Sequence, residues 1–141
     1  MSVFVILTFI TLSFFSAGAQ KIEGSKVPTP VKFSFSKKYP DITPKWEKEK
    51  DNYEANFKQN GQAMSIIIDP NGNIIETETD IKLTELPSPV LVYIKEHYKG
   101  KAIKEGAKII KPDGTITYEA EVLGMDLIFD ANGKFIKQAK D

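Results

Sequence analysis

The sequence contains no cysteine, and it has only one histidine and one tryptophan among its 141 residues. Without cysteine the protein can form no disulfide, offer no thiol nucleophile and build no thiolate metal site. The single imidazole, His97, cannot form a histidine-rich zinc site, and any serine triad would need it as the base. The G-x-S-x-G motif and glycine-rich phosphate loops are absent as well. We therefore predict no catalytic residue, no metal ligand and no cofactor.

A net charge is also lacking, because 19 Lys and Arg residues balance 19 Asp and Glu residues. Such a chain has no overall field to hold a polyanion, and the basic pair Lys37-Lys38 is too short to form a nucleic-acid patch. We expect no nucleic-acid partner. The length and the hydrophobic content of 41% are those of one ordinary globular domain.

The N-terminus has the pattern of an export signal. Residues 3–15 form an apolar run without a charge, and the small residues Ser-Ala-Gly-Ala follow at 16–19. The run is shorter than the roughly 20 residues that span a bilayer, although a buried helix or an uncleaved anchor is the alternative. We predict a signal peptide at 1–19, cleaved after Ala19, no membrane span after cleavage, and a periplasmic or secreted protein.

The remaining chain repeats itself. Residues 27–31 return as 86–90, residues 53–57 return as 118–122, and residues 68–75 return as 129–136, always in the same order. Matched blocks in the same order, at spacings near 60 residues, are typical of internal repeats. We predict that residues 20–141 form a single domain made of two repeats, 26–80 and 85–141.

Each repeat is expected to open with a helix. Thr29 and Ser88 are suited to cap its first turn, and Pro30 and Pro89 to occupy the first helical position. Apolar residues then recur every four positions on one face, which indicates a face turned to the core. They are Val31, Phe35 and Tyr39 in the first repeat and Val90, Ile94 and Tyr98 in the second.

After each helix the apolar period changes to two, which is typical of half-buried strands. Residues 52–58 and 115–122 show this alternation most clearly, and Asn-Gly or Asp-Gly pairs at 60–61, 71–72, 113–114 and 132–133 predict tight hairpins. We predict an α+β fold, a tandem repeat of one helix plus a four-stranded antiparallel meander, with the helices on one face of a sheet of up to eight strands.

The segments Asp69-x-Asn71-Gly72 and Asp130-x-Asn132-Gly133 resemble the start of a calcium loop. The later oxygen ligands and the glutamate at the twelfth position are missing, and strand patterns rather than helices flank both segments. We predict hairpin turns here, with calcium binding as the weaker alternative.

The sheet face without helices is the expected interaction surface. If Ile66 and Ile68 point to the core, strict alternation turns Ile67 outward, and Ile128 follows by repeat. Trp46 aligns with Glu105 in the second repeat, so the repeat gives it no core role. The predicted partner-binding residues are Trp46, Glu54, Ile67, Glu119 and Ile128.

The landmarks Tyr39-Pro40, Trp46, residues 53–57 and residues 69–73, followed by a second set, resemble the PepSY-like domains exported by Bacteroidetes. In fold these domains are similar to the tandem halves of the beta-lactamase inhibitor protein. The resemblance implies an extracytoplasmic, non-enzymatic binding or inhibitor-like module. The second set departs from the pattern, with Glu105 in place of tryptophan and Lys99-Gly100 in place of Tyr-Pro.

We therefore expect the partner to be a protein or peptide of the cell envelope. Two alternatives belong to other classes. One is an envelope enzyme that uses paired carboxylates, Glu54 with Glu119 or Glu119 with Glu121. The other is a structural envelope-assembly protein that pairs through the edge strands of its sheet.

Overall fold

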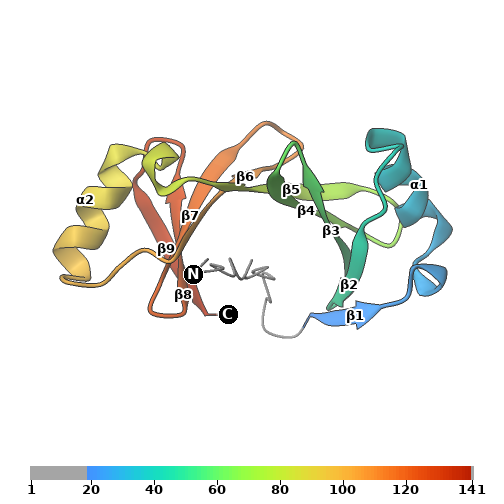
Figure 1. Ribbon diagram of the computed structural model, residues 1–141, viewed down its shortest axis with the longest axis horizontal. Coiled ribbons are helices and arrows are strands. Elements are labelled where there is room, and N and C mark those ends of the chain that lie inside the picture. Colours follow the sequence, from blue (N-terminus) through green and yellow to red (C-terminus); the bar gives the residue numbers. More distant parts are fainter. Residues whose placement is uncertain (1–18, 141) are drawn as a thin grey trace, which may run out of the picture.

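The computed structural model describes residues 19–140, which form one antiparallel sheet of nine strands and two α-helices (Figure 1). The strands lie in the sheet in chain order, so each pairs only with its neighbours in sequence. The elements are β1 (Gln20–Ile22), α1 (Thr29–Lys38), β2 (Lys45–Glu49), β3 (Asn52–Gln59), β4 (Gln62–Ile68), β5 (Ile74–Ile81), α2 (Ser88–His97), β6 (Glu105–Ile110), β7 (Ile116–Val122), β8 (Met125–Asp130) and β9 (Phe135–Lys140), with short 3-10 turns at Gly24–Lys26 and Leu83–Glu85. Residues 1–18 of the predicted signal peptide lie outside the described residues.

The sheet has nine strands, so the prediction of up to eight was wrong by one. The additional strand is β1, in which Ile22 lies opposite Trp46 of β2. Three residues are too few to show an alternating pattern, and β1 directly follows the predicted cleavage point. The α+β class, the antiparallel pairing and the two helices agree with the prediction.

Both helices pack on the same face of the sheet and make two core clusters with it, one in each half. Val31 and Phe35 of α1 are buried in the first cluster, and Val90 and Ile94 of α2 are buried in the second. The first cluster also contains Val27, Tyr39, Trp46, Ala55, Phe57, Ile66 and Ile68. The second also contains Leu86, Ala120, Val122, Leu127 and Phe129. The helical stripes expected from the sequence therefore face the core, with Tyr98 packed at the edge of the second cluster.

The helix starts differ from the prediction in one detail. The helices include Thr29 and Ser88 as their first residues, and the capping positions fall on Pro28 and Pro87, without a side-chain hydrogen bond to the first turn. A proline cap positions the entering chain through its fixed φ angle instead of through a hydroxyl.

The hairpin between β4 and β5 packs against the start of α1. Gly72 has φ +93°, and a Cβ there would lie 2.8 Å from the Pro30 carbonyl oxygen and 2.9 Å from Ser34 Oγ. The Ser34 hydroxyl donates a hydrogen bond to the Gly72 carbonyl oxygen. Glycine is required here for its backbone conformation and for the close approach.

The sheet curves between the two helices, which cover its outer side at opposite ends (Figure 1). Electrostatic interactions across the opposite side reach over several strands. Glu76 on β5 is influenced by Glu49 on β2 and by Lys137 on β9. Residues from the two halves of the molecule therefore act on one another across the face that lies opposite α1 and α2.

Candidate binding face

Strand register assigns each side chain to one of the two faces of the sheet. Trp46 lies opposite Ala55, and both belong to the core under α1. Because successive side chains of a strand point to opposite faces, Glu47 and Glu54 point away from the helices. They lie directly opposite each other. We call this side of the sheet the helix-free face.

Four of the five predicted site residues share the helix-free face. Glu54 on β3 lies opposite Ile67 on β4, and Glu119 on β7 lies opposite Ile128 on β8. Ile67, Glu119 and Ile128 are half-buried, and Glu54 is buried. Strict alternation thus places these side chains as the sequence predicted.

Trp46 lies on the opposite side, which corrects its predicted place on the binding face. Its side chain is only 8% exposed and packs edge-on against Phe35 of α1, with ring centroids 5.7 Å apart. The error came from a repeat alignment displaced by one residue. Trp46 pairs with Ala55, and Gly106 pairs with Ala120, so Gly106 rather than Glu105 holds the corresponding position. A shift of one residue in a strand reverses the face.

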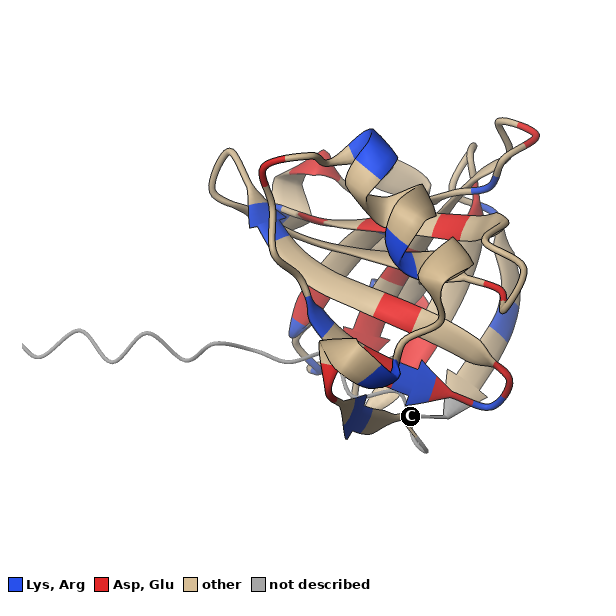
Figure 2. Cartoon of the chain, turned by 90° about the vertical axis from the view of Figure 1, so that its right-hand side faces the viewer, with Lys and Arg blue, Asp and Glu red and all other residues tan. Residues whose placement is uncertain are grey.

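Carboxylates dominate the first half and the centre of the helix-free face. Successive acidic residues at 76, 78 and 80 place three carboxylates on one side of β5, the fifth of the nine strands. Figure 2 shows acidic segments on several neighbouring strands of the sheet. We define the acidic cluster as the five glutamates of β2, β3 and β5 that interact electrostatically: Glu47, Glu49, Glu54, Glu76 and Glu78.

Glu54 and Glu78 of the acidic cluster lie in an environment that opposes their ionisation. Burial raises the pKa of Glu54 to about 7, repulsion from Glu47 and Glu49 adds to the effect, and a hydrogen bond from the Ser65 hydroxyl partly offsets it. Burial raises the pKa of Glu78 too, with Glu54 and Glu76 contributing repulsion. A carboxylate needs either a cation or hydrogen-bond donors to stay ionised out of water.

Asp80 extends this behaviour towards the second half of the sheet. Burial, followed by repulsion from Glu105, raises the pKa of Asp80 to about 7. Burial also raises the pKa of Glu76, although Lys111 and Lys137 lower it. Near neutral pH the carboxyl groups of Asp80 and Glu76 therefore ionise less readily than usual, and a nearby cation would favour their ionised form.

Glu47 has a carboxylate oxygen that lacks a hydrogen-bond partner in the described part of the chain. The residue is 5% exposed, and the oxygen concerned, Oε2, is itself buried. Leaving a buried polar atom unsatisfied costs about 1–3 kcal/mol, and more for a charged group. The Glu47 carboxylate therefore has unused capacity to accept a hydrogen bond.

Apolar side chains lie beside these carboxylates. Ala107 lies opposite Asp80 and Glu119, and Ile109 lies opposite Glu78; both are buried although neither α1 nor α2 covers them. With Ile67 and Ile128, they give the helix-free face an apolar centre across both halves. A surface that combines an apolar centre with polar groups resembles protein interfaces in composition.

Sequence reasoning missed Glu47, Glu76, Glu78 and Asp80. The available signal was the alternation from Glu76 to Asp80, in which threonines separate the acidic residues. A period of two places all three carboxylates on one face. The segment lacks an apolar face, so it was not recognised as the central strand.

Other candidate positions have local structural roles. The Asp69 carboxylate accepts hydrogen bonds at 2.9 Å from the backbone N–H groups of Asn71 and Asn73, and its pKa is lowered chiefly by its bond with the Asn73 side chain. Both Asp-x-Asn-Gly segments are hairpin turns, as predicted. His97 is exposed, and its Nδ1 lies 2.9 Å from the Tyr93 carbonyl oxygen.

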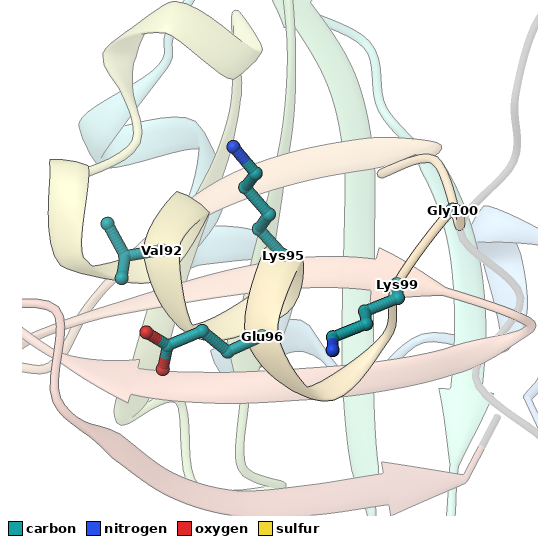
Figure 3. A pocket seen from close by; sticks show the side chains of 5 residues that line it. All are labelled: Val92, Lys95, Glu96, Lys99 and Gly100. Carbon is teal, nitrogen blue, oxygen red and sulfur yellow. The ribbon is translucent and has the colours of Figure 1, made fainter.

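A surface hollow lies on the outer side of α2, lined by Val92, Lys95, Glu96, Lys99 and Gly100 (Figure 3). Its side chains spread from a single helix and the turn that follows.

Residues 19–140 contain no group of three or more His, Cys, Asp or Glu side chains arranged to hold a metal ion. Within the same range, no helix has the length and apolar character needed to cross a membrane.

Solved structures share this fold. A protein of the DUF2874 family from Bacteroides uniformis has a TM-score of 0.70 and 22% identity, covering 79% of this chain and 87% of that one. A Bacteroides eggerthii protein described as "putative periplasmic" has a TM-score of 0.70 and 21% identity, with the same coverages. A BLIP-like protein from Bacteroides fragilis has a TM-score of 0.60 and 24% identity, covering 79% and 84%. At such identities the likeness concerns the fold.

No curated protein matches the chain significantly. One family does match along nearly the whole described region, at residues 16–76 and again at 52–137, with the description "Putative beta-lactamase-inhibitor-like, PepSY-like". The resemblance seen in the sequence landmarks is thereby confirmed. The chain belongs to this PepSY-like family.

Proposed function

We propose that this protein is an exported, non-enzymatic binding or inhibitor-like module that holds a protein or peptide of the cell envelope on its helix-free face. The observation that carries the proposal is the burial of Glu47 and Glu54, each 5% exposed, on a sheet face that neither α1 nor α2 covers. Replacing buried charges by apolar residues is often neutral or stabilising, so burial of this kind is poorly explained by stability alone.

The apolar residues of the face support binding over a wider area. Ile67 and Ile128 lie on β4 and β8, so the two halves of the sheet both contribute. Glu54 and Glu119, their cross-strand partners, are the polar contacts of the proposed surface. Apolar residues enclosed by polar groups are the usual centre of an interface.

The experiment compares the proteins that purified wild type and two variants retain from the cell envelope and culture medium of the organism that produces this protein. The double variant Ile67→Ser with Ile128→Ser tests the helix-free face, and Phe33→Ser, on the exposed side of α1, is the control. We expect a retained protein that is lost from the double variant and kept by the control. Equal retention by all three, with folding verified by circular dichroism, would contradict the proposal.

A carboxylate enzyme is a second candidate, favoured by the pKa values of about 7 for Glu54 and Asp80. Such values suit general acid–base catalysis near neutral pH. They are equally expected wherever burial and like charges act together, which is the arrangement of the acidic cluster. Turnover of envelope polysaccharides or peptides that disappears in Glu54→Gln and persists in Glu96→Gln would favour the enzyme.

We also propose that residues 20–141 form a single domain, and infer that 26–80 and 85–141 are two copies of one unit within it. The helices α1 and α2 have ten residues each, and four strands follow each helix. Gly72 lies against the start of α1, and Gly133 lies against Pro87 and Pro89 at the start of α2.

The third functional candidate is a structural envelope-assembly protein that pairs through its edge strands, β1 and β9. Concentration-dependent self-association in sedimentation velocity would favour it.

A further inference from the structure

We propose that the acidic cluster receives a basic side chain, lysine or arginine, from the protein partner, with its charged end against Glu47 and Glu54 and its methylene stem on Ile67. This inference rests on the proposed function and specifies the chemistry of the partner. It follows from the row of residues across the sheet, the unsatisfied oxygen of Glu47 and the apolar position within the row.

The row runs across four neighbouring strands. Register places Glu47 opposite Glu54, Glu54 opposite Ile67 and Ile67 opposite Glu76. Adjacent strands lie about 4.8 Å apart, so the row is long enough for an extended lysine or arginine side chain. Such side chains bury their methylene groups on apolar surface while the charged end reaches a polar partner.

The charged groups around the row favour a cation. The charged groups that act on Glu54 are Glu47, Glu49 and Glu76, and all of them are carboxylates. Those that act on Glu78 are Glu54, Glu76, Asp80 and Asp126. Lys21 of β1 lies opposite Glu47, and Lys45 lies on the same side of β2 as Glu47. Lys111 and Lys137 act on Glu76 from the second half of the sheet.

The unsatisfied Glu47 oxygen indicates a hydrogen-bond donor. An ammonium or guanidinium group donates charge-assisted hydrogen bonds to carboxylates, typically at about 2.7–2.9 Å. A metal ion would need several oxygen ligands converging on one point. Residues 19–140 show no such grouping. A donor on a long, partly apolar arm matches both the carboxylates and Ile67.

The test uses an end-blocked tetralysine peptide as the probe and the same peptide with acetylated lysines as the neutral control. Amide NMR shifts locate the probe, and calorimetry measures its affinity for wild type, the double variant Glu47→Gln with Glu54→Gln, and Glu96→Gln. Glu96 is exposed on α2, so its variant controls for loss of a surface charge outside the face.

We expect tetralysine, but not its acetylated form, to shift amides of β2, β3 and β4. The double variant should bind about tenfold or more weakly, because it removes charges that meet the cation, while Glu96→Gln should bind like wild type. Equal weakening in both variants would show general charge attraction and overturn the proposal. Tighter binding of spermidine or calcium at the same strands would overturn it in favour of a free polyamine or a metal ion.

Failure here is distinguishable from failure of the proposed function. If tetralysine does not bind while Ile67→Ser with Ile128→Ser still loses a retained protein, the helix-free face binds a partner that offers no basic side chain to the cluster. If neither effect is seen, the face is not a binding surface.

Discussion

Glu47 and Glu54 lie directly opposite each other on β2 and β3, and each is only 5% exposed on a face that neither α1 nor α2 covers. Like charges placed opposite each other in a sheet destabilise it. The sheet tolerates the pair because Glu54 is partly protonated near neutral pH, as its pKa of about 7 implies. The same property makes Glu54 responsive to a cation and to pH.

The first prediction concerns stability and pH. The pKa of Glu54 rises from 4.5 to about 7 on folding, so the folded state binds more protons between these values. The free energy of unfolding should therefore fall as pH rises from about 4.5 to 7 and level off above 7, by an amount on the order of 2–3 kcal/mol from this group. Chemical denaturation at pH 5 and pH 8 measures the difference.

Glu54→Gln should reduce this loss of stability, since a neutral side chain cannot ionise. At pH 8 the variant should be more stable than wild type, whereas Glu96→Gln should follow the wild-type pH profile. A Glu54→Gln variant with an unchanged profile would mean that the carboxyl titrates normally in the folded protein.

The second prediction concerns Trp46, which is buried in the core under α1 rather than exposed on the predicted binding face. Removing a buried tryptophan costs about 3–5 kcal/mol through lost contacts and the cavity left behind. Phe33, 66% exposed on α1, is the matched aromatic control and should change stability by about 0.5 kcal/mol or less on truncation. Thermal unfolding followed by circular dichroism compares Trp46→Ala with Phe33→Ala, and equal stabilities would place Trp46 outside the core.

The third prediction separates backbone strain from packing at two glycines of positive φ. Gly72 (φ +93°) approaches the Pro30 carbonyl oxygen, whereas a Cβ at Gly61 (φ +79°) meets nothing within 4 Å. Gly61→Ala should cost about 1 kcal/mol from backbone conformation alone. Gly72→Ala should cost at least about 1 kcal/mol more, because the methyl group displaces α1 from the hairpin. Urea denaturation gives both values, and similar losses would show that the close approach relaxes freely.

The fourth prediction concerns proton release. A cation bound near Glu54 favours its ionised form, so binding of tetralysine at pH 7 should release protons to the buffer. Calorimetry in two buffers of different ionisation enthalpy measures that release. It should decrease at pH 9, where Glu54 is already ionised, and in Glu54→Gln. Binding without proton release at pH 7 would mean that the probe does not meet this carboxylate.

The sequence predicted the parts of the fold that leave a periodic trace. The stripe through Val31 and Phe35, the alternation through Ala55 and the Asn-Gly turns all correspond to observed elements. Strand β1 left no such trace, since its three residues are ordered by pairing with β2. Tertiary pairing, rather than local pattern, determines whether so short a segment forms a strand.

The candidate site was predictable only where alternation had an apolar reference. Ile67 and Ile128 were placed correctly because their neighbours are plainly core residues. Trp46 was misplaced by an alignment one residue out of register, which reverses the face of a strand. The acidic cluster was missed because glutamates from β2, β3 and β5 come together only through the curvature and strand order of the sheet.

The most direct test of the proposed binding face is amide NMR of this protein, free and bound to the protein that it retains from the organism that produces it. The amides that shift locate the contact surface on this chain. We expect shifts and broadening on the strands of the helix-free face, at Glu47, Glu54, Ile67 and Ile128, with the outer sides of α1 and α2 unaffected. Changes confined to the helices or to the edges β1 and β9 would contradict it.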